Sequence, residues 1–103
     1  MIKSLTWFLP ADSAKEYRIS EDSTPTLLWV KGGAGGFYEV DVRVDGVSMF
    51  PASRKPSILS ARTEEEFDRA EFATQRVRKG SIVSFKVLQG GRSGMSVQLD
   101  LES

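Results

Sequence analysis

An unbroken alternation of side chains at residues 37–44 constrains this chain more than any other stretch. Apolar residues at every second position are separated by charged ones, in the order Tyr38, Glu39, Val40, Asp41, Val42, Arg43 and Val44. Successive side chains on a strand point to opposite faces of a sheet, so this pattern predicts a β-strand with one apolar face and one charged, solvated face. The rest of the chain is most simply interpreted as further strands beside or across this one.

Alternation of the same kind predicts strands at residues 82–88 and 95–102. A glycine-rich turn at residues 89–94 separates them, so we expect these two strands to pair as an antiparallel hairpin. Asp45-Gly46 predicts a second hairpin, because both central positions of a type I′ turn need a positive φ.

Shorter apolar segments predict the remaining strands. Residues 1–9 form a strand that Pro10 ends, and residues 17–19 and 58–59 form short ones. Residues 26–30 are apolar nearly throughout, as in a strand that is buried on both faces or lies at a subunit contact. About eight short strands separated by glycine and proline predict a single all-β domain over residues 1–103, a sandwich or a barrel. The predicted core consists of Val40, Val42, Val44, Val83, Phe85, Val87, Val97, Leu99 and Leu101.

Residues 63–79 allow two interpretations. Thr63 to Glu66 has the form of a capping box, and apolar residues follow at helical spacing, which locally favours a helix. The alternative is a turn at residues 64–68 followed by an extended segment over residues 70–77, in which Phe72 points into the core. The all-β context favours this second interpretation.

Composition excludes several classes of function. The chain contains no cysteine and no histidine, which removes thiolate nucleophiles, zinc–thiolate sites and the usual general base. We therefore expect no enzyme, no metal and no cofactor. Fourteen basic and fourteen acidic residues cancel, so neither nucleic acid nor a membrane is an expected partner. The glycine run at residues 32–36 lacks a following Gly-Lys-Ser/Thr and is interpreted as a flexible connection, not a phosphate loop.

From Leu28 onward, the order of signals resembles the small jelly-roll β-sandwich module of bacteriophage virion proteins. Such modules occur as capsid decoration or cement proteins and at the tips of tail fibres. The resemblance rests on residues 38–46, on residues 54–60 with their Lys-Pro pair, on Phe72, on residues 77–87 and on residues 94–101. It covers about three quarters of the chain. Ser81 stands where the family usually has aspartate, and Phe72 where tryptophan is common.

The resemblance implies an antiparallel two-sheet jelly-roll-like β-sandwich and a structural role in the virion. The expected function is that of a capsid cement or decoration protein on the capsid surface, assembled in the host cytoplasm. The expected partners are the major capsid protein or another virion protein, with this chain as a homotrimer. The alternative is a tail-fibre or neck-associated module that binds a receptor or carbohydrate.

Candidate contact residues follow from aromatic and basic side chains. Trp7 and Trp29 could stack on sugar rings, although packing in the core or at a subunit interface is the favoured interpretation. Phe8 or the strand at residues 26–30 is expected at the subunit contact. The acidic run Glu64-Glu65-Glu66 with Asp68 is interpreted as a solvated turn and not as a calcium site. The basic residues predicted to meet acidic capsid loops are Arg54, Lys55, Arg76, Arg78 and Lys79.

Overall fold

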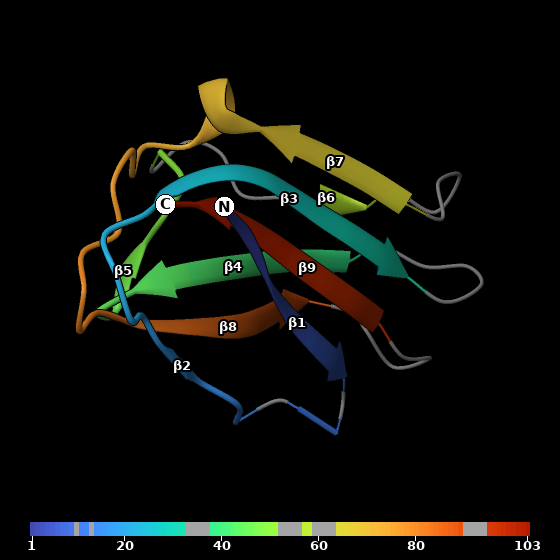
Figure 1. Ribbon diagram of the computed structural model, residues 1–103. Helices are drawn as coiled ribbons and strands as arrows, with labels where there is room; N and C mark the ends of the chain where they lie inside the picture. Colours follow the sequence, from blue (N-terminus) through green and yellow to red (C-terminus); the bar gives the residue numbers. More distant parts are fainter. Residues whose placement is uncertain (10, 13, 33–37, 52–56, 59–63, 90–94) are drawn as a thin grey trace.

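The computed structural model describes residues 1–9, 11–12, 14–32, 38–51, 57–58, 64–89 and 95–103. These residues form nine strands and one 3-10 turn (Figure 1). The strands are β1 (Ile2–Leu9), β2 (Tyr17–Arg18), β3 (Thr24–Gly32), β4 (Tyr38–Val44), β5 (Val47–Ser48), β6 (Ser57–Ile58), β7 (Glu64–Asp68), β8 (Ile82–Gln89) and β9 (Met95–Glu102).

The strands build two antiparallel sheets. One has the order β1-β9-β3-β7, and the other has the order β2-β8-β4-β5 with β6 also paired to β4. Strands from the two halves of the chain pair in reverse order, because β1 pairs with β9, β2 with β8, and β3 with β7. The chain therefore folds back on itself as nested strand pairs around the turn that follows β4. This nesting, divided between two sheets, is the strand order of a jelly roll. The all-β, two-sheet sandwich predicted from the sequence is confirmed.

A single cluster of buried apolar side chains fills the space between the sheets. Trp7 is fully buried, stacks on Phe85 at a centroid distance of 5.9 Å and meets the edge of Tyr17 at 5.2 Å. Its indole nitrogen donates to the Lys15 carbonyl at 2.8 Å, which satisfies the one polar atom of the ring. The core therefore joins β1 of one sheet to β2 and β8 of the other.

Most of the predicted core is found where the alternation placed it. The buried members are Val40, Val42, Val83, Phe85, Val97, Leu99 and Leu101. Val44 is partly buried against the same cluster, and the side chain of Val87 lies outside the described residues. The predicted Asp45-Gly46 hairpin is also confirmed, since φ is 52° at Asp45 and 82° at Gly46.

The predicted hairpin between residues 82–88 and 95–102 is wrong. Both segments are strands, but β8 pairs with β2 and β4 whereas β9 pairs with β1 and β3. Their apolar faces meet across the core instead of side by side in one sheet. Alternation fixes which face of each strand is buried, and two strands with buried faces can satisfy that condition equally well from opposite sheets.

Residues 64–77 differ from both interpretations in detail. Glu64–Asp68 is a strand, not a turn, and the turn lies one step later as the 3-10 segment Arg69–Glu71. Asp68 and Glu71 form the capping box, because each side chain accepts a backbone N–H of the other end. Phe72 is buried as predicted and packs edge-on against Phe50 at 5.5 Å.

Candidate interaction surface

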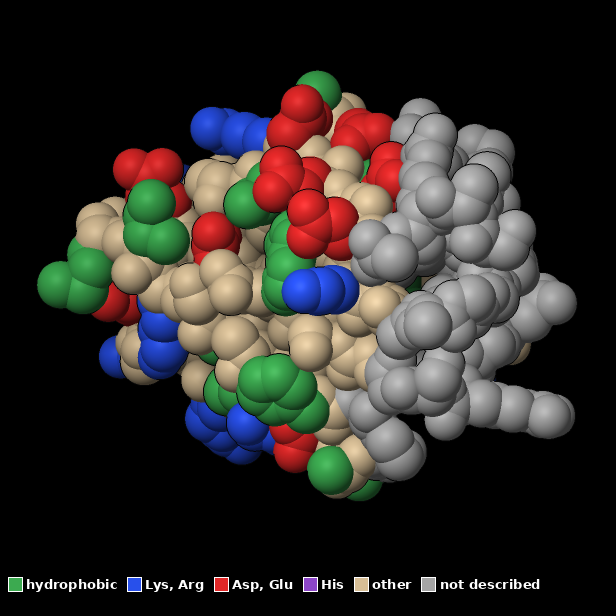
Figure 2. All heavy atoms as spheres, turned by 90° about the vertical axis from the view of Figure 1, so that its right-hand side faces the viewer, with side chains coloured by type: hydrophobic (Ala, Val, Ile, Leu, Met, Phe, Trp, Pro, Cys, Tyr) green, Lys and Arg blue, Asp and Glu red, His purple; other side chains and the backbone are tan. Residues whose placement is uncertain are grey.

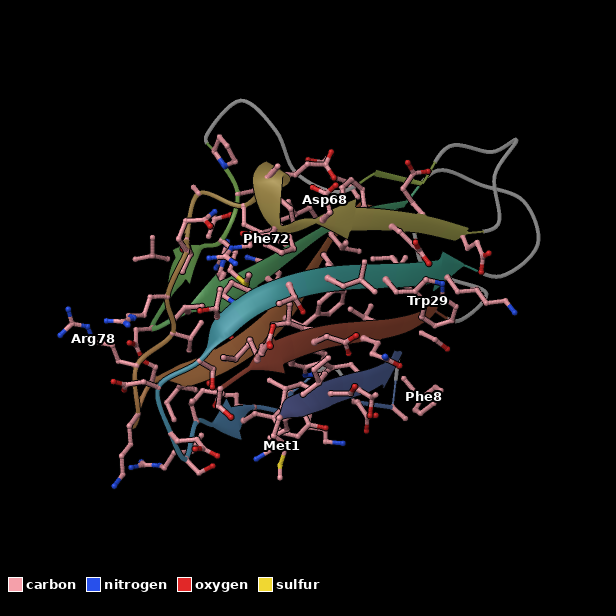
Figure 3. All side chains as sticks on the ribbon, turned by 45° about the horizontal axis from the view of Figure 1, so that its top comes forward. Met1, Phe8, Trp29, Asp68, Phe72 and Arg78 are labelled. Atoms are coloured by element: carbon pink, nitrogen blue, oxygen red, sulfur yellow. The ribbon has the colours of Figure 1, made fainter. Side chains whose placement is uncertain are left out.

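The outer face of the β1-β9-β3-β7 sheet carries two of the sequence-predicted contact residues, Phe8 and Trp29. On each strand, the residues that alternate with the buried core point outward. The apolar members of this outer face are Ile2, Phe8, Leu27 and Trp29. Figure 3 shows Phe8 and Trp29 at the same end of the sheet, at the ends of β1 and β3.

The register places Trp29 between two polar neighbours. Gln98 of β9 lies directly opposite it on one side, and Glu66 of β7 lies opposite it on the other. Residues opposite each other in an antiparallel pair have Cβ atoms about 4.5–5.5 Å apart, so these side chains are in contact range. Trp29 is half-buried, and its Nε1 donates to Oε2 of Glu64 at 3.2 Å.

The charged side chains on the outer face are mostly acidic. The outward residues of the four strands include five carboxylates and one ammonium group, namely Glu64, Glu66, Asp68, Asp100, Glu102 and Lys31. Figure 2, which looks onto one end of the sandwich, shows a group of acidic side chains in the upper middle of the view. Asp100 is partly engaged, since Ser4 donates to it at 2.6 Å and Gln98 at 3.0 Å. A chain with no net charge thus has a distinctly negative sheet face.

The edge strand β1 carries two of the exposed large apolar side chains of the described residues. Ile2 is 62% exposed and Phe8 61% exposed, and Met1 precedes them. The far end of this edge is closed by Asp12, which accepts from the Phe8 amide at 2.8 Å and donates its own amide to the Phe8 carbonyl at 2.7 Å. Tyr17 donates to the Thr6 carbonyl at 2.8 Å. The edge is thereby protected near Phe8, which limits uncontrolled strand pairing there.

The predicted contact residues do not form one site. Trp7 lies in the core, so it cannot join Trp29 in a sugar-stacking pair. Arg76, Arg78 and Lys79 are exposed and precede the Gly80 turn. Arg78 lies at the opposite end of the molecule from Phe8 and Trp29 (Figure 3). Arg54 and Lys55 lie outside the described residues.

The strand at residues 26–30 is only half accessible. As part of β3 it is flanked by β9 and β7, so another molecule can reach it only through its outward side chains Leu27 and Trp29. The predicted solvated acidic turn at residues 64–68 is a strand, and its outward carboxylates are exposed on the outer face.

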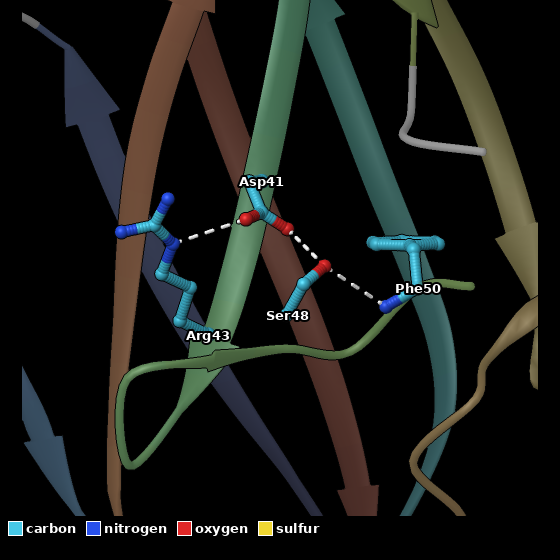
Figure 4. Close-up of polar contacts among 4 residues, drawn as sticks. All are labelled: Asp41, Arg43, Ser48 and Phe50. Carbon is cyan, nitrogen blue, oxygen red and sulfur yellow. Dashed lines mark hydrogen bonds and ion pairs between the residues drawn. The ribbon is translucent and has the colours of Figure 1, made fainter. Parts of the chain in front are cut away.

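A polar cluster on β4 that was not predicted from the sequence is buried. Asp41, predicted to be solvated, is only 1% exposed. Its carboxylate accepts from Nε of Arg43 at 3.0 Å and from the hydroxyl of Ser48 at 2.5 Å, and Ser48 in turn accepts from the Phe50 amide at 3.1 Å (Figure 4). The signal available in the sequence was an aspartate and an arginine two residues apart on one strand face, just before a tight turn.

This cluster is structural. It links β4 across the Asp45-Gly46 hairpin to Phe50, whose ring packs edge-on against Phe67 of the other sheet at 6.0 Å. Each carboxylate oxygen has a donor, and none of the buried side-chain nitrogen or oxygen atoms in the described part of the chain lacks a partner.

Comparison with protein-family models, curated proteins and solved structures gives no match for this chain. Within the described residues, no group of three or more acidic side chains is arranged to hold a metal ion. The same residues contain no helix long and apolar enough to cross a membrane.

Proposed function

We propose that this chain is a structural protein of a bacteriophage virion that decorates and cements the capsid surface, with the major capsid protein as its partner. The observation that carries the proposal is the nested jelly-roll strand order. It is the architecture of the virion module that the sequence resembles, reached here from the strand pairing alone. A fold hosts many functions, so the proposal also depends on the sequence resemblance and on the exposed surface.

The copy number in purified particles tests this proposal. A cement protein is present in a fixed, high ratio to the major capsid protein, which quantitative mass spectrometry measures directly. A few copies per particle would instead indicate a tail or neck position, and absence from particles would refute a virion role.

The proposed assembly is a homotrimer whose subunit contact includes β1. Three of the five large apolar side chains that are most exposed in the described residues are Met1, Ile2 and Phe8. Apolar side chains gathered on an edge strand are typical of a surface that another chain covers. The strand at residues 26–30, the other predicted contact segment, is not assigned to the subunit contact, because β9 and β7 flank it on both sides.

Sedimentation of matched variants tests the trimer. Ile2→Ser with Phe8→Ser is expected to shift the protein from trimer to monomer. Val47→Ser serves as the control, because Val47 is 69% exposed but lies on the β4–β5 hairpin. A wild-type protein that remains monomeric both in solution and on the capsid would contradict this assembly.

The second candidate is a receptor- or carbohydrate-binding module of the tail or neck. The observation that favours it is the pair of accessible rings, Phe8 and Trp29, on the same outer face. Aromatic rings on a flat sheet face, with amide and hydroxyl groups between them, provide stacking and hydrogen bonds to sugars. Glycan-array binding that Trp29→Ala abolishes would support this candidate over the first.

A further inference from the structure

The surroundings of Trp29 combine an accessible indole with solvated carboxylates. Glu64 accepts the indole N–H at 3.2 Å, and Glu66 stands opposite Trp29 in the register. Both carboxylates are exposed, and no salt bridge joins either of them to another described residue. An aromatic ring beside two carboxylates offers a guanidinium or ammonium group both cation–π attraction and charge-assisted hydrogen bonds.

The charge of the whole outer face narrows the choice of partner. Five carboxylates against one ammonium group among its outward residues repel nucleic acid and anionic lipid. The same imbalance disfavours packing of this face against the identical face of a second copy, because like charges would be placed together. A positively charged protein surface is the partner that complements it.

We propose that the outer face of the β1-β9-β3-β7 sheet binds a positively charged segment of a partner protein, with one arginine or lysine side chain seated on Trp29 beside Glu64 and Glu66. The inference rests on the proposed function, which makes that segment part of a virion protein. In this proposal the contact surface of this chain is acidic and that of the partner is basic. The sequence predicted the opposite arrangement, in which basic residues of this chain meet acidic loops.

Two tryptophans in distinct environments make the test direct. The indole N–H of each gives one signal in a nitrogen–proton correlation NMR spectrum. Trp7 is fully buried and bonded to the Lys15 carbonyl, whereas Trp29 faces outward. The Trp29→Phe variant identifies the Trp29 signal by its loss. The Trp7 signal then reports whether the core of each variant is intact.

The probe is a blocked Gly-Arg-Gly-Arg-Gly peptide, compared at low salt with the same peptide carrying glutamate in place of arginine. We expect the arginine peptide alone to shift the Trp29 signal and leave Trp7 unmoved, with binding that weakens as salt is raised. Glu64→Gln with Glu66→Gln should weaken binding by about threefold to tenfold. Glu16→Gln with Glu21→Gln removes the same charge from exposed positions outside the face and should change the affinity little.

Three results would overturn the proposal. They are no shift of Trp29 at millimolar arginine peptide, equal weakening in both double variants, and a Trp29 shift caused only by a neutral oligosaccharide such as maltotriose. The last result would identify the face as a glycan site. Because these measurements use the isolated protein, they can fail while the particle copy number still supports a cement role, and the reverse also holds.

Discussion

Asp41→Ala is expected to destabilise the fold by about 2–3 kcal/mol. The substitution removes two hydrogen bonds to an ionised carboxylate, from Arg43 at 3.0 Å and from Ser48 at 2.5 Å. A hydrogen bond to a charged group contributes roughly 1.5–3 kcal/mol. Part of this loss is offset, because a 1% exposed charge no longer has to be desolvated and the Arg43 side chain, 33% exposed, can be hydrated.

Ser48→Ala measures the Ser48–Asp41 hydrogen bond separately from the Arg43–Asp41 hydrogen bond. It removes the donor to Asp41 and also leaves the Phe50 amide without its acceptor at 3.1 Å, so a loss of about 1–3 kcal/mol is expected. If Asp41, Ser48 and the Phe50 amide act as one chain of hydrogen bonds, the effects of the two substitutions are not additive. The Asp41→Ala/Ser48→Ala double variant should then lose less free energy of unfolding than the two single variants lose together. A coupling of about 1 kcal/mol or more is expected for residues in direct contact.

Denaturant and thermal unfolding measure these changes. The fluorescence of the buried Trp7 reports the core, and 2–3 kcal/mol corresponds to a fall in Tm of about 10–20 °C in a domain of this size. Arg43→Met leaves the buried Asp41 carboxylate with Ser48 as its donor and no cationic partner, so it should cost about 1.5–3 kcal/mol. A loss below about 0.5 kcal/mol for Asp41→Ala, or strict additivity with Ser48→Ala, would refute the view that this cluster holds the hairpin to the core.

Three further changes test other parts of the fold. Phe85→Ala should cost about 3–5 kcal/mol, because it leaves a cavity beside Trp7; unfolding by urea measures the loss, and a cost below 1.5 kcal/mol would contradict a packed core there. Gly46→Ala should cost about 1–2 kcal/mol through its positive φ alone, since nothing lies within 4 Å of an added Cβ; an unchanged Tm would show that the turn differs from the one described. Detectable hydrolysis of glycans or peptides that a single carboxylate substitution abolishes would contradict the prediction that the chain is not an enzyme.

The strands and the core were predictable because a half-buried strand leaves its period in the sequence. Val40 and Val42 alternate with charged residues, and Val97 and Leu99 alternate with polar ones, so each segment specified both its conformation and its buried face. The Asp45-Gly46 turn was equally local, since positive φ at two successive positions restricts the residue types. These features depend on nearest neighbours along the chain.

The pairing of strands was not predictable in the same way. Val83 and Val97 have the same local pattern, yet they belong to different sheets and are both buried in the shared core. Nothing within either segment distinguishes a hairpin from a crossover between sheets. In residues 63–79, helical spacing competed with the all-β context; tertiary pairing of β7 with β3 decided the outcome for Glu64–Asp68.

The burial of Asp41 has the same origin. A carboxylate on the polar side of an alternating strand is normally solvated, and the alternation predicted this for Asp41. Its burial depends on Ser48, which the hairpin brings back opposite Arg43 in the register. Whether such a residue is buried or solvated cannot be predicted until its strand partner on the same face of the sheet is known.

The large apolar side chains of β1 and β3 constrain where this protein can bind. Leu5, Trp7 and Leu28 are buried in the core, whereas Ile2 and Phe8 are exposed and Trp29 is half-buried. The alternation that buries the first set necessarily turns the second set toward the outer face of the β1-β9-β3-β7 sheet. That face also carries the excess of carboxylates, so apolar contact and negative charge occur on the same surface. A partner that covers it must therefore present both an apolar patch and a cationic side chain, and a partner that offers only one of them would leave either the rings or the carboxylates unmatched.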